Sequence, residues 1–285
     1  MATKKTQTTA LVKWDEELAK QAEVAAGMEA NTGGGQFFST KGGILSWQDA
    51  PLPGNQMAVV ILDSVLENVF YEGRYDPDVP QGPTCFAFAR EEKTMAPHNI
   101  VVEAGNAQHD QCAVCPMNEF GTAEVGKGKA CRNTRRLGMI PAGTFNAAGK
   151  FELNDDADHY ETTAVGFMKL PVTSVKGYAS FVKQVAGALR RPPFGIVTKV
   201  KVVPDPKSQF KVVFEPIMNL PDELMGAIMK RHEEVKSTID FPYTPAEEET
   251  APAPKRGSRA AAKPVAKRGS RAAAKPVAKR GARKY

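Results

Sequence analysis

The sequence of 285 residues predicts a mainly β domain with flanking helices, an α+β fold. Short apolar runs rich in β-branched and aromatic residues recur between 36 and 217, separated by Gly, Pro and Asn turns. Two longer segments show helical spacing instead. The last segment is too biased in composition to join a core. We therefore expect an N-terminal helix with a glycine hinge (1–35), a nucleic-acid-binding domain (36–245), and a disordered linker with a basic C-terminal tail (246–285).

The N-terminal part combines a helix with a flexible connector. Residues 11–28 place Leu18 and Ala22 at helical spacing, and Gly33 to Gly35 follow as a hinge. These glycines are not a phosphate-binding loop, because no Gly-Lys-Ser/Thr follows. Residues 1–9 are polar, unlike a signal peptide, and no stretch approaches the roughly 18 apolar residues that would span a bilayer. We expect a soluble cytoplasmic protein, in the host cell cytoplasm if it is viral, with no membrane partner.

The folded domain is predicted as a series of short strands. They are expected at 36–39, 44–48, 57–69, 84–88, 136–141, 164–170, 196–203 and 209–216. Helices are expected at 173–189, with Ser174 as N-cap, and at 220–239. About five to seven of these strands, with one helix before the last two, are typical of a small, partly open β-barrel of the oligonucleotide-binding type.

All four cysteines of the chain fall between 85 and 131. They are Cys85, Cys112, Cys115 and Cys131, and the middle two form a Cys-x-x-Cys knuckle that can share one tetrahedral ion. In a reducing compartment such spacing favours a structural Zn²⁺ site over disulfides, with free or redox thiols as the alternative. His109 is a possible substitute ligand. A thioredoxin-like role is disfavoured, because Pro116 and a polar loop follow the knuckle.

The segment around these cysteines has too few large apolar residues to hold one shape unaided, so we expect a zinc-stabilised insertion at about 85–138. A catalytic zinc would keep an open position and an adjacent general base. His98 with Glu103 or Glu119 could be assigned these roles, but nothing in the sequence fixes them there. The chain is therefore expected not to be an enzyme.

A basic run next to the last cysteine, together with strand aromatics, predicts a nucleic-acid surface. Backbone neutralisation by Lys and Arg and base stacking on aromatic rings hold single strands. The alternatives are an ordinary solvated face for the basic residues and a core position for the aromatics. The candidates are Lys127, Lys129, Arg132, Arg135, Arg136, Trp47, Tyr71 and Tyr75.

The net positive charge of the chain comes from its C-terminal tail. Residues 251–285 hold 12 Lys and Arg and no Asp or Glu, so residues 1–250 have 38 − 12 = 26 basic against 32 acidic residues, a net charge of −6. The 12-residue unit KRGSRAAAKPVA occurs twice and begins a third time. Such a tail would bind polyanions without sequence preference, with solubilisation or localisation as the alternative. Its candidate contacts are Lys255, Arg256, Arg259, Lys267, Arg268, Arg271, Lys279 and Arg280.

Three features together resemble the zinc-containing single-stranded DNA-binding proteins of tailed bacteriophages: Cys85, the stretch CAVCPMNEFG at 112–121, and GKGKACR at 126–132. The resemblance covers roughly 36–217. It implies an oligonucleotide-binding fold with a zinc-held subdomain beside the strand groove. In the best-known members one histidine and three cysteines bind zinc, and an acidic C-terminal segment recruits replication partners.

The resulting hypothesis is a non-catalytic protein that binds single-stranded DNA in phage-type replication or recombination, with replication or recombination proteins as further partners. Duplex DNA could also bind through the tail. The alternatives are a duplex-compacting or transcription-associated zinc protein, a metal-dependent nucleic-acid enzyme, and a virion structural protein.

Overall fold

The structure is a computed structural model that describes residues 18, 21, 37–48, 50–73, 82–124 and 126–243. These residues belong to one compact unit, 1–246, and a second unit comprises 247–285. Leu18 and Gln21 are helical. The remainder of the expected N-terminal helix, the glycine hinge, Tyr75, and the linker and repeat tail lie outside the described residues. Among the described residues, no helix is long and apolar enough to cross a membrane.

A ten-stranded sheet forms the framework, in the order β10-β9-β4-β6-β8-β1-β2-β3, with β5 paired to β4 and β7 to β6. The neighbours are antiparallel except for the parallel pair β1 and β8. This confirms the mainly β, α+β prediction. The strands are β1 (Phe37–Ser39), β2 (Ser46–Trp47), β3 (Ala50–Pro51), β4 (Gln56–Phe70), β5 (Cys85–Ala89), β6 (Arg132–Phe145), β7 (Phe151–Leu153), β8 (Gly166–Leu170), β9 (Ile196–Asp205) and β10 (Gln209–Asn219).

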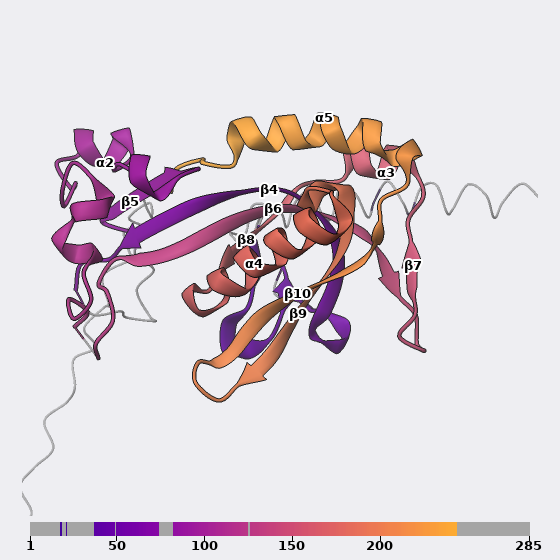
Figure 1. Cartoon of the computed structure of the whole chain (residues 1–285), viewed down its shortest axis with the longest axis horizontal. Coiled ribbons are helices and arrows are strands. Elements are labelled where there is room, and N and C mark those ends of the chain that lie inside the picture. Colours follow the sequence, from indigo (N-terminus) through magenta and orange to yellow (C-terminus); the bar gives the residue numbers. More distant parts are fainter. Residues whose placement is uncertain are drawn as a thin grey trace, which may run out of the picture. The chain divides into compact units, whose positions relative to one another are not determined.

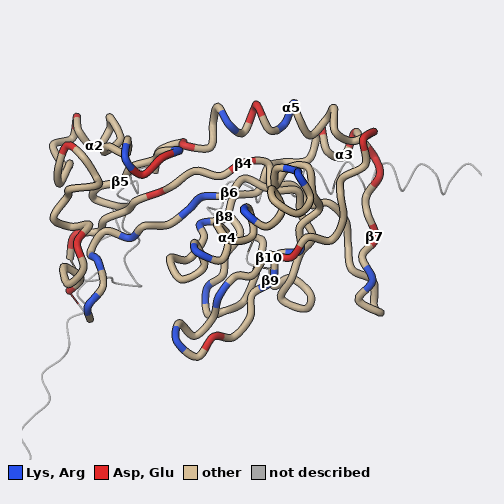
Figure 2. Tube along the Cα trace, in the orientation of Figure 1, with Lys and Arg blue, Asp and Glu red and all other residues tan. Residues whose placement is uncertain are grey.

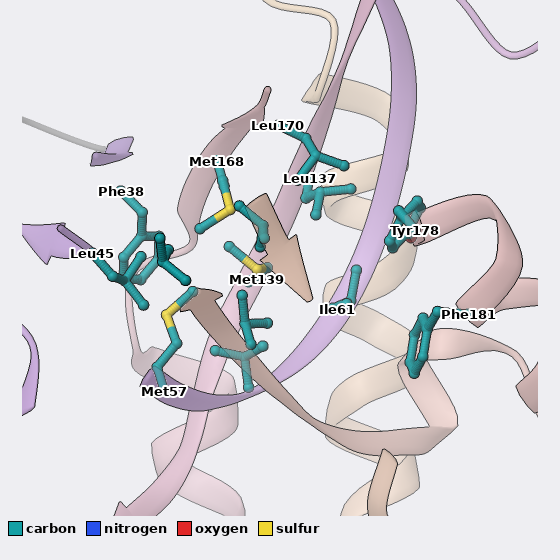
Figure 3. Packing of buried hydrophobic residues seen from close by; sticks show 14 of the residues in the cluster. Phe38, Leu45, Met57, Ile61, Leu137, Met139, Met168, Leu170, Tyr178 and Phe181 are labelled. Carbon is teal, nitrogen blue, oxygen red and sulfur yellow. The ribbon is translucent and has the colours of Figure 1, made fainter. Parts of the chain in front are cut away.

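Two helices cover opposite faces of this sheet (Figure 1). Helix α4 (Val172–Gln184) adds Tyr178 and Phe181 to a core that includes Ile61 of β4. Figure 3 shows this core at close range, with the two aromatic rings on one side. Helix α5 (Asp222–Thr238) adds Leu224 to a second core that includes Val60. Because successive strand residues point to opposite faces, β4 needs apolar side chains at nearly every position, which explains its continuous apolar run.

The sheet curls until residues at the two ends of the strand order meet. Asn55, which precedes β4, donates from Nδ2 to the carbonyl of Gly43, 2.8 Å away, and to that of Val202 in β9, 3.1 Å away. Its Oδ1 accepts from the amide of Leu45 at 2.6 Å. One side chain therefore bridges two segments that no strand pairing joins. The oligonucleotide-binding type of barrel stays a prediction.

Two sequence-based boundaries differ from the structure. Ser174 was expected as a helix N-cap, but Pro171 has that position, and the buried Ser174 hydroxyl instead accepts the amide of Val212 at 2.9 Å. A buried hydroxyl needs such a partner, and this bond ties α4 to β10. Strand β6 begins at Arg132 rather than near 136, so residues 132–138 belong to the central sheet. The segment outside it is residues 90–131, which we call the cysteine lobe; it includes the short helix α2 (Asn99–Glu103).

Candidate functional site

The four cysteines line one pocket at the end of the β4–β6 pair. Strand register brings two of them there: Cys85 lies opposite Phe70 at the end of β4, and Cys131 directly precedes Arg132, which lies opposite Val69. The 3₁₀ turns Cys112–Val114 and Pro116–Asn118 of the lobe bring the other two. All four are buried, with 8 or 9% of their surface exposed.

Backbone hydrogen bonds hold the cysteine segments in place. The amide of Cys112 donates to the Met95 carbonyl at 3.0 Å, and the amide of Cys131 donates to the Met117 carbonyl at 2.8 Å. The buried Asn118 donates from its side-chain nitrogen to the Cys112 carbonyl at 2.7 Å. The knuckle and the last cysteine are thus tied to one another independently of their sulfur atoms.

Burial and mutual repulsion dominate the electrostatics of the pocket. Burial, then the neighbouring thiols, raises the pKa of Cys112 to about 11 and that of Cys131 to about 12. Burial likewise raises the pKa of Cys85, with Cys115 adding to the effect. The four sulfur atoms therefore lie near enough to repel one another when they are deprotonated. A set of thiolates in this pocket would need a cation to balance its negative charge.

Two hydrogen-bond donors face the sulfur atoms, and neither was expected from the sequence. The backbone N–H of Gln108 bonds to Cys85 and the side chain of Asn68 bonds to Cys112, and each lowers the pKa of its thiol. Asn68 is buried, and its Oδ1 accepts from Asn133 at 2.7 Å, which leaves its NH₂ group to donate. Such donors orient and stabilise sulfur ligands in metal sites.

The side chains do not converge as they stand: among the described residues, no group of three or more His, Cys, Asp or Glu side chains is arranged to hold a metal ion. The shared pocket and the mutual pKa effects nevertheless place all four cysteines together. His109 also lines the pocket, but it is exposed, and its Nδ1 accepts from the Gln111 amide at 3.1 Å.

Next to the pocket, aromatic and basic side chains gather across three neighbouring strands. The Arg132 guanidinium lies 5.7 Å and the Lys169 ammonium 5.9 Å from the centre of the Tyr71 ring. Lys169 donates to the hydroxyl of Tyr243 at 2.7 Å. We call Tyr71, Arg132, Lys169 and Tyr243 the Tyr71 cluster. Tyr71 and Arg132 were candidates from the sequence; Lys169 and Tyr243 were missed.

Arg136, expected on the nucleic-acid surface, is instead 1% exposed. Its guanidinium pairs with the fully buried Glu67 at 2.7 Å and donates to the carbonyls of Ile239 and Phe241 at 3.1 and 2.8 Å. The rings of Phe88 and Phe241 lie 4.4 and 4.2 Å from it. The Tyr243 hydroxyl donates to Glu67 at 2.7 Å. Arg136 is therefore part of the interior, where it fixes residues 239–243 against the sheet.

The remaining candidates are spread over both faces. Arg135 is half-buried on the α4 side, 5.5 Å from the centre of the Tyr178 ring, because strand alternation turns it away from Arg132 and Arg136. Lys127 is exposed and Lys129 half-buried in the cysteine lobe. Trp47, expected as a stacking residue, packs against the first core with its ring 4.4 Å from that of Phe38.

A charge signal in the sequence could have pointed to Lys169. Residues 162–204 contain seven Lys and Arg and no Asp or Glu, whereas 151–161 contain five Asp and Glu and no Lys or Arg. Figure 2 shows the acidic group next to β7 and α3 (Ala157–Thr162).

Comparison with known protein families, with curated proteins and with solved structures finds no match for this chain.

Proposed function

We propose that this protein is a non-catalytic single-stranded DNA-binding protein acting in replication or recombination, with a structural zinc ion in its cysteine pocket. The observation that carries the proposal is the Tyr71 cluster. An aromatic ring with two cations beside it, at the end of adjacent strands, combines base stacking with phosphate neutralisation. Arg132 is exposed and Tyr71 and Lys169 are half-buried, so a strand can reach them.

The local charge balance favours an anionic ligand. Arg132, Lys169 and the buried Arg136 lie near a single carboxylate, Glu67, which is already engaged by Arg136. Burial lowers the pKa of Lys169, and the two arginines lower it further, although Glu67 acts in the opposite direction. A phosphate group would relieve this excess of positive charge.

Zinc would be held by Cys85, Cys112, Cys115 and Cys131. Four sulfur ligands are the donor set of a closed structural site, so the ion would stabilise the lobe and would have no open position for a substrate. Thr84–Cys85 and Cys131–Arg132 lead into paired strands beside Tyr71. A fixed arrangement of the cysteine segments would therefore fix the positions of Tyr71 and Arg132.

The repeat tail would add binding that ignores sequence and falls steeply with salt, because its positive charges release counterions from the phosphate backbone. Its contribution is separable from that of the Tyr71 cluster, which belongs to the folded unit. The tail alone would bind duplex as well as single strands.

Zinc analysis combined with oligonucleotide binding at several salt concentrations tests the proposal, for the full chain and for a version ending at Glu249. We expect bound zinc, and a preference for single over double strands that survives loss of the tail. Arg132→Ala should weaken single-strand binding several-fold. Lys230→Ala is the matched control, because Lys230 lies on α5, 3.9 Å from Glu161. Absence of binding at low salt by both versions would overturn the proposal, and equal affinity for duplex would favour a compacting protein.

A further inference from the structure

Phe120, in the cysteine lobe, is the most exposed of the large apolar side chains among the described residues, with 81% of its surface exposed. It lies outside the Tyr71 cluster and contributes to neither sheet core. An exposed phenylalanine has a cost in contact with water, so its surroundings indicate what could cover it.

The loop that presents Phe120 is closed by internal hydrogen bonds. The amide of Gly121 donates to the carbonyl of Gly128 at 2.8 Å. The hydroxyl of Thr122 donates to the Glu119 carbonyl at 2.7 Å and accepts from the amide of Ala130 at 3.0 Å. Gly121 has a φ of +91°, a conformation that L side chains rarely adopt. These contacts fix the backbone on both sides of Phe120 and leave its ring in solvent.

A cation is built in beside the ring. The Lys129 ammonium lies 5.2 Å from the centre of the Phe120 ring and donates to Asn118 Oδ1 at 3.1 Å. Asn118 in turn donates to the Cys112 carbonyl at 2.7 Å. The aromatic–cation pair is therefore connected through one buried amide to the cysteine pocket. Lys127, two residues before Lys129, is exposed in the same loop.

We propose that Phe120 is a stacking platform for one unpaired base, with Lys129 and Lys127 neutralising the adjacent phosphates. This inference rests on the proposed single-strand binding and adds a second contact point to it. Lys129 and Arg132 are three residues apart, so their Cα atoms are separated by at most about 11 Å. One strand can thus engage Phe120 beside Lys129 and Tyr71 beside Arg132. The loop also carries the exposed carboxylates Glu119 and Glu124, but the charge in contact with the ring is the Lys129 ammonium, which favours a nucleic-acid base over an apolar protein partner.

The test compares Phe120→Ala with the full-length wild type on two oligonucleotides of equal length, one carrying bases and the other made abasic. We expect about tenfold weaker binding to the base-bearing strand and no change on the abasic one. Phe120→Tyr should retain binding to both. Val102→Ala is the matched control, because Val102 is 55% exposed on α2 of the same lobe and lies outside the cysteine knuckle.

A second measurement uses Phe120→Trp, whose fluorescence should be quenched by the base-bearing strand and not by the abasic one. If Phe120→Ala bound both strands with wild-type affinity and the fluorescence of Phe120→Trp were not quenched, this inference would be overturned. The proposed function would stay intact. Equal losses on both strands would also overturn the inference, because they would assign Phe120 to loop structure. If the wild type bound neither strand, the proposed function itself would fall, and this inference with it.

Discussion

The sheet and the cysteine lobe are stabilised in different ways. The sheet buries aliphatic and aromatic side chains on both faces, in two cores closed by α4 and α5. Among the described residues of the lobe, the buried apolar side chains other than cysteine are Met95, Pro97 and Val101. Cysteines contribute much of the buried interior of the lobe, whereas large apolar residues fill the cores of the sheet. We therefore expect the sheet to fold from burial alone, whereas the lobe would need the proposed zinc ion to hold its shape.

The largest effect is expected from loss of the metal ligands, which should destabilise the cysteine lobe and not the sheet. Cys112→Ser with Cys115→Ser, or a strong chelator, should release the metal and unfold residues 90–131 while the sheet stays folded. Structural zinc contributes on the order of 10–16 kcal/mol in small peptides, far more than the lobe's apolar burial. Hydrogen exchange along the chain, with metal content measured in parallel, checks this. Val102→Ala, on α2 of the lobe and outside the knuckle, should change neither quantity. Unchanged protection of the lobe in the metal-free protein would show that burial suffices there too.

The buried pair Glu67 and Arg136 is the polar exception within the sheet. Glu67→Ala should destabilise the folded unit by about 3–5 kcal/mol, because it leaves the Arg136 charge buried without its partner. Urea unfolding followed by circular dichroism measures the loss. The double variant Glu67→Leu with Arg136→Met should recover much of it. A Glu67→Ala variant as stable as the wild type would mean that the aromatic rings and carbonyls around Arg136 are sufficient.

The strands were predictable from local patterns, and the site was predictable only in part. Apolar runs located β4, β9 and β10 well, because burial on both faces or clean alternation is visible locally. The gathering of the cysteines also followed from their spacing. The prediction that Arg132, Arg135 and Arg136 form one surface failed, because strand β6 was expected to begin near 136. With Arg132 as the first strand residue, alternation assigns Arg132 and Arg136 to one face and Arg135 to the other.

The missed residues depend on contacts between distant segments. Lys169 reaches Arg136 only through the β6–β8 register, and Tyr243 reaches Glu67 across 176 positions of sequence. Neither pairing leaves a periodic pattern. The burial of Arg136 is likewise set by residues 239–243 folding over the sheet, and a local count of charges cannot detect this.

A smaller effect is expected at Lys169, where folding and binding should respond in opposite directions. Lys169→Met should weaken single-strand binding several-fold and lower the salt slope by about 0.7, the contribution of one phosphate contact. It should not reduce stability, because a desolvated cation is removed. Lys230→Met is the control. Increased binding by the variant would exclude Lys169 from the DNA surface.

A change of pH alters the charge of Lys169 without a mutation, so it also compares the effect of that charge on folding with its effect on binding. Because the folded pKa of Lys169 lies below its unfolded value, folding releases a proton between the two, and the stability contributed by this group rises with pH across that interval. Binding should instead weaken as the charge is lost, at lower pH than for an ordinary lysine. Affinity measured against pH for wild type and Lys169→Met isolates this group. The charged or titratable neighbours that face it are Glu67, Arg132, Arg136, Tyr71 and Tyr243.

The smallest effect, close to zero, is expected for substitution of His109. Comparing it with substitution of Cys85 decides which of the two residues is the fourth zinc ligand. His109→Ala should leave the zinc content at one ion per chain, because its exposed ring already uses Nδ1 to accept the Gln111 amide. Loss of that bond costs about 1 kcal/mol locally. Cys85→Ser should remove the ion, since Cys85 is buried in the pocket and its sulfur already receives a hydrogen bond. The reverse pattern would mean that zinc is held by three cysteines and a histidine, and that Cys85 serves only the packing of β5 against β4.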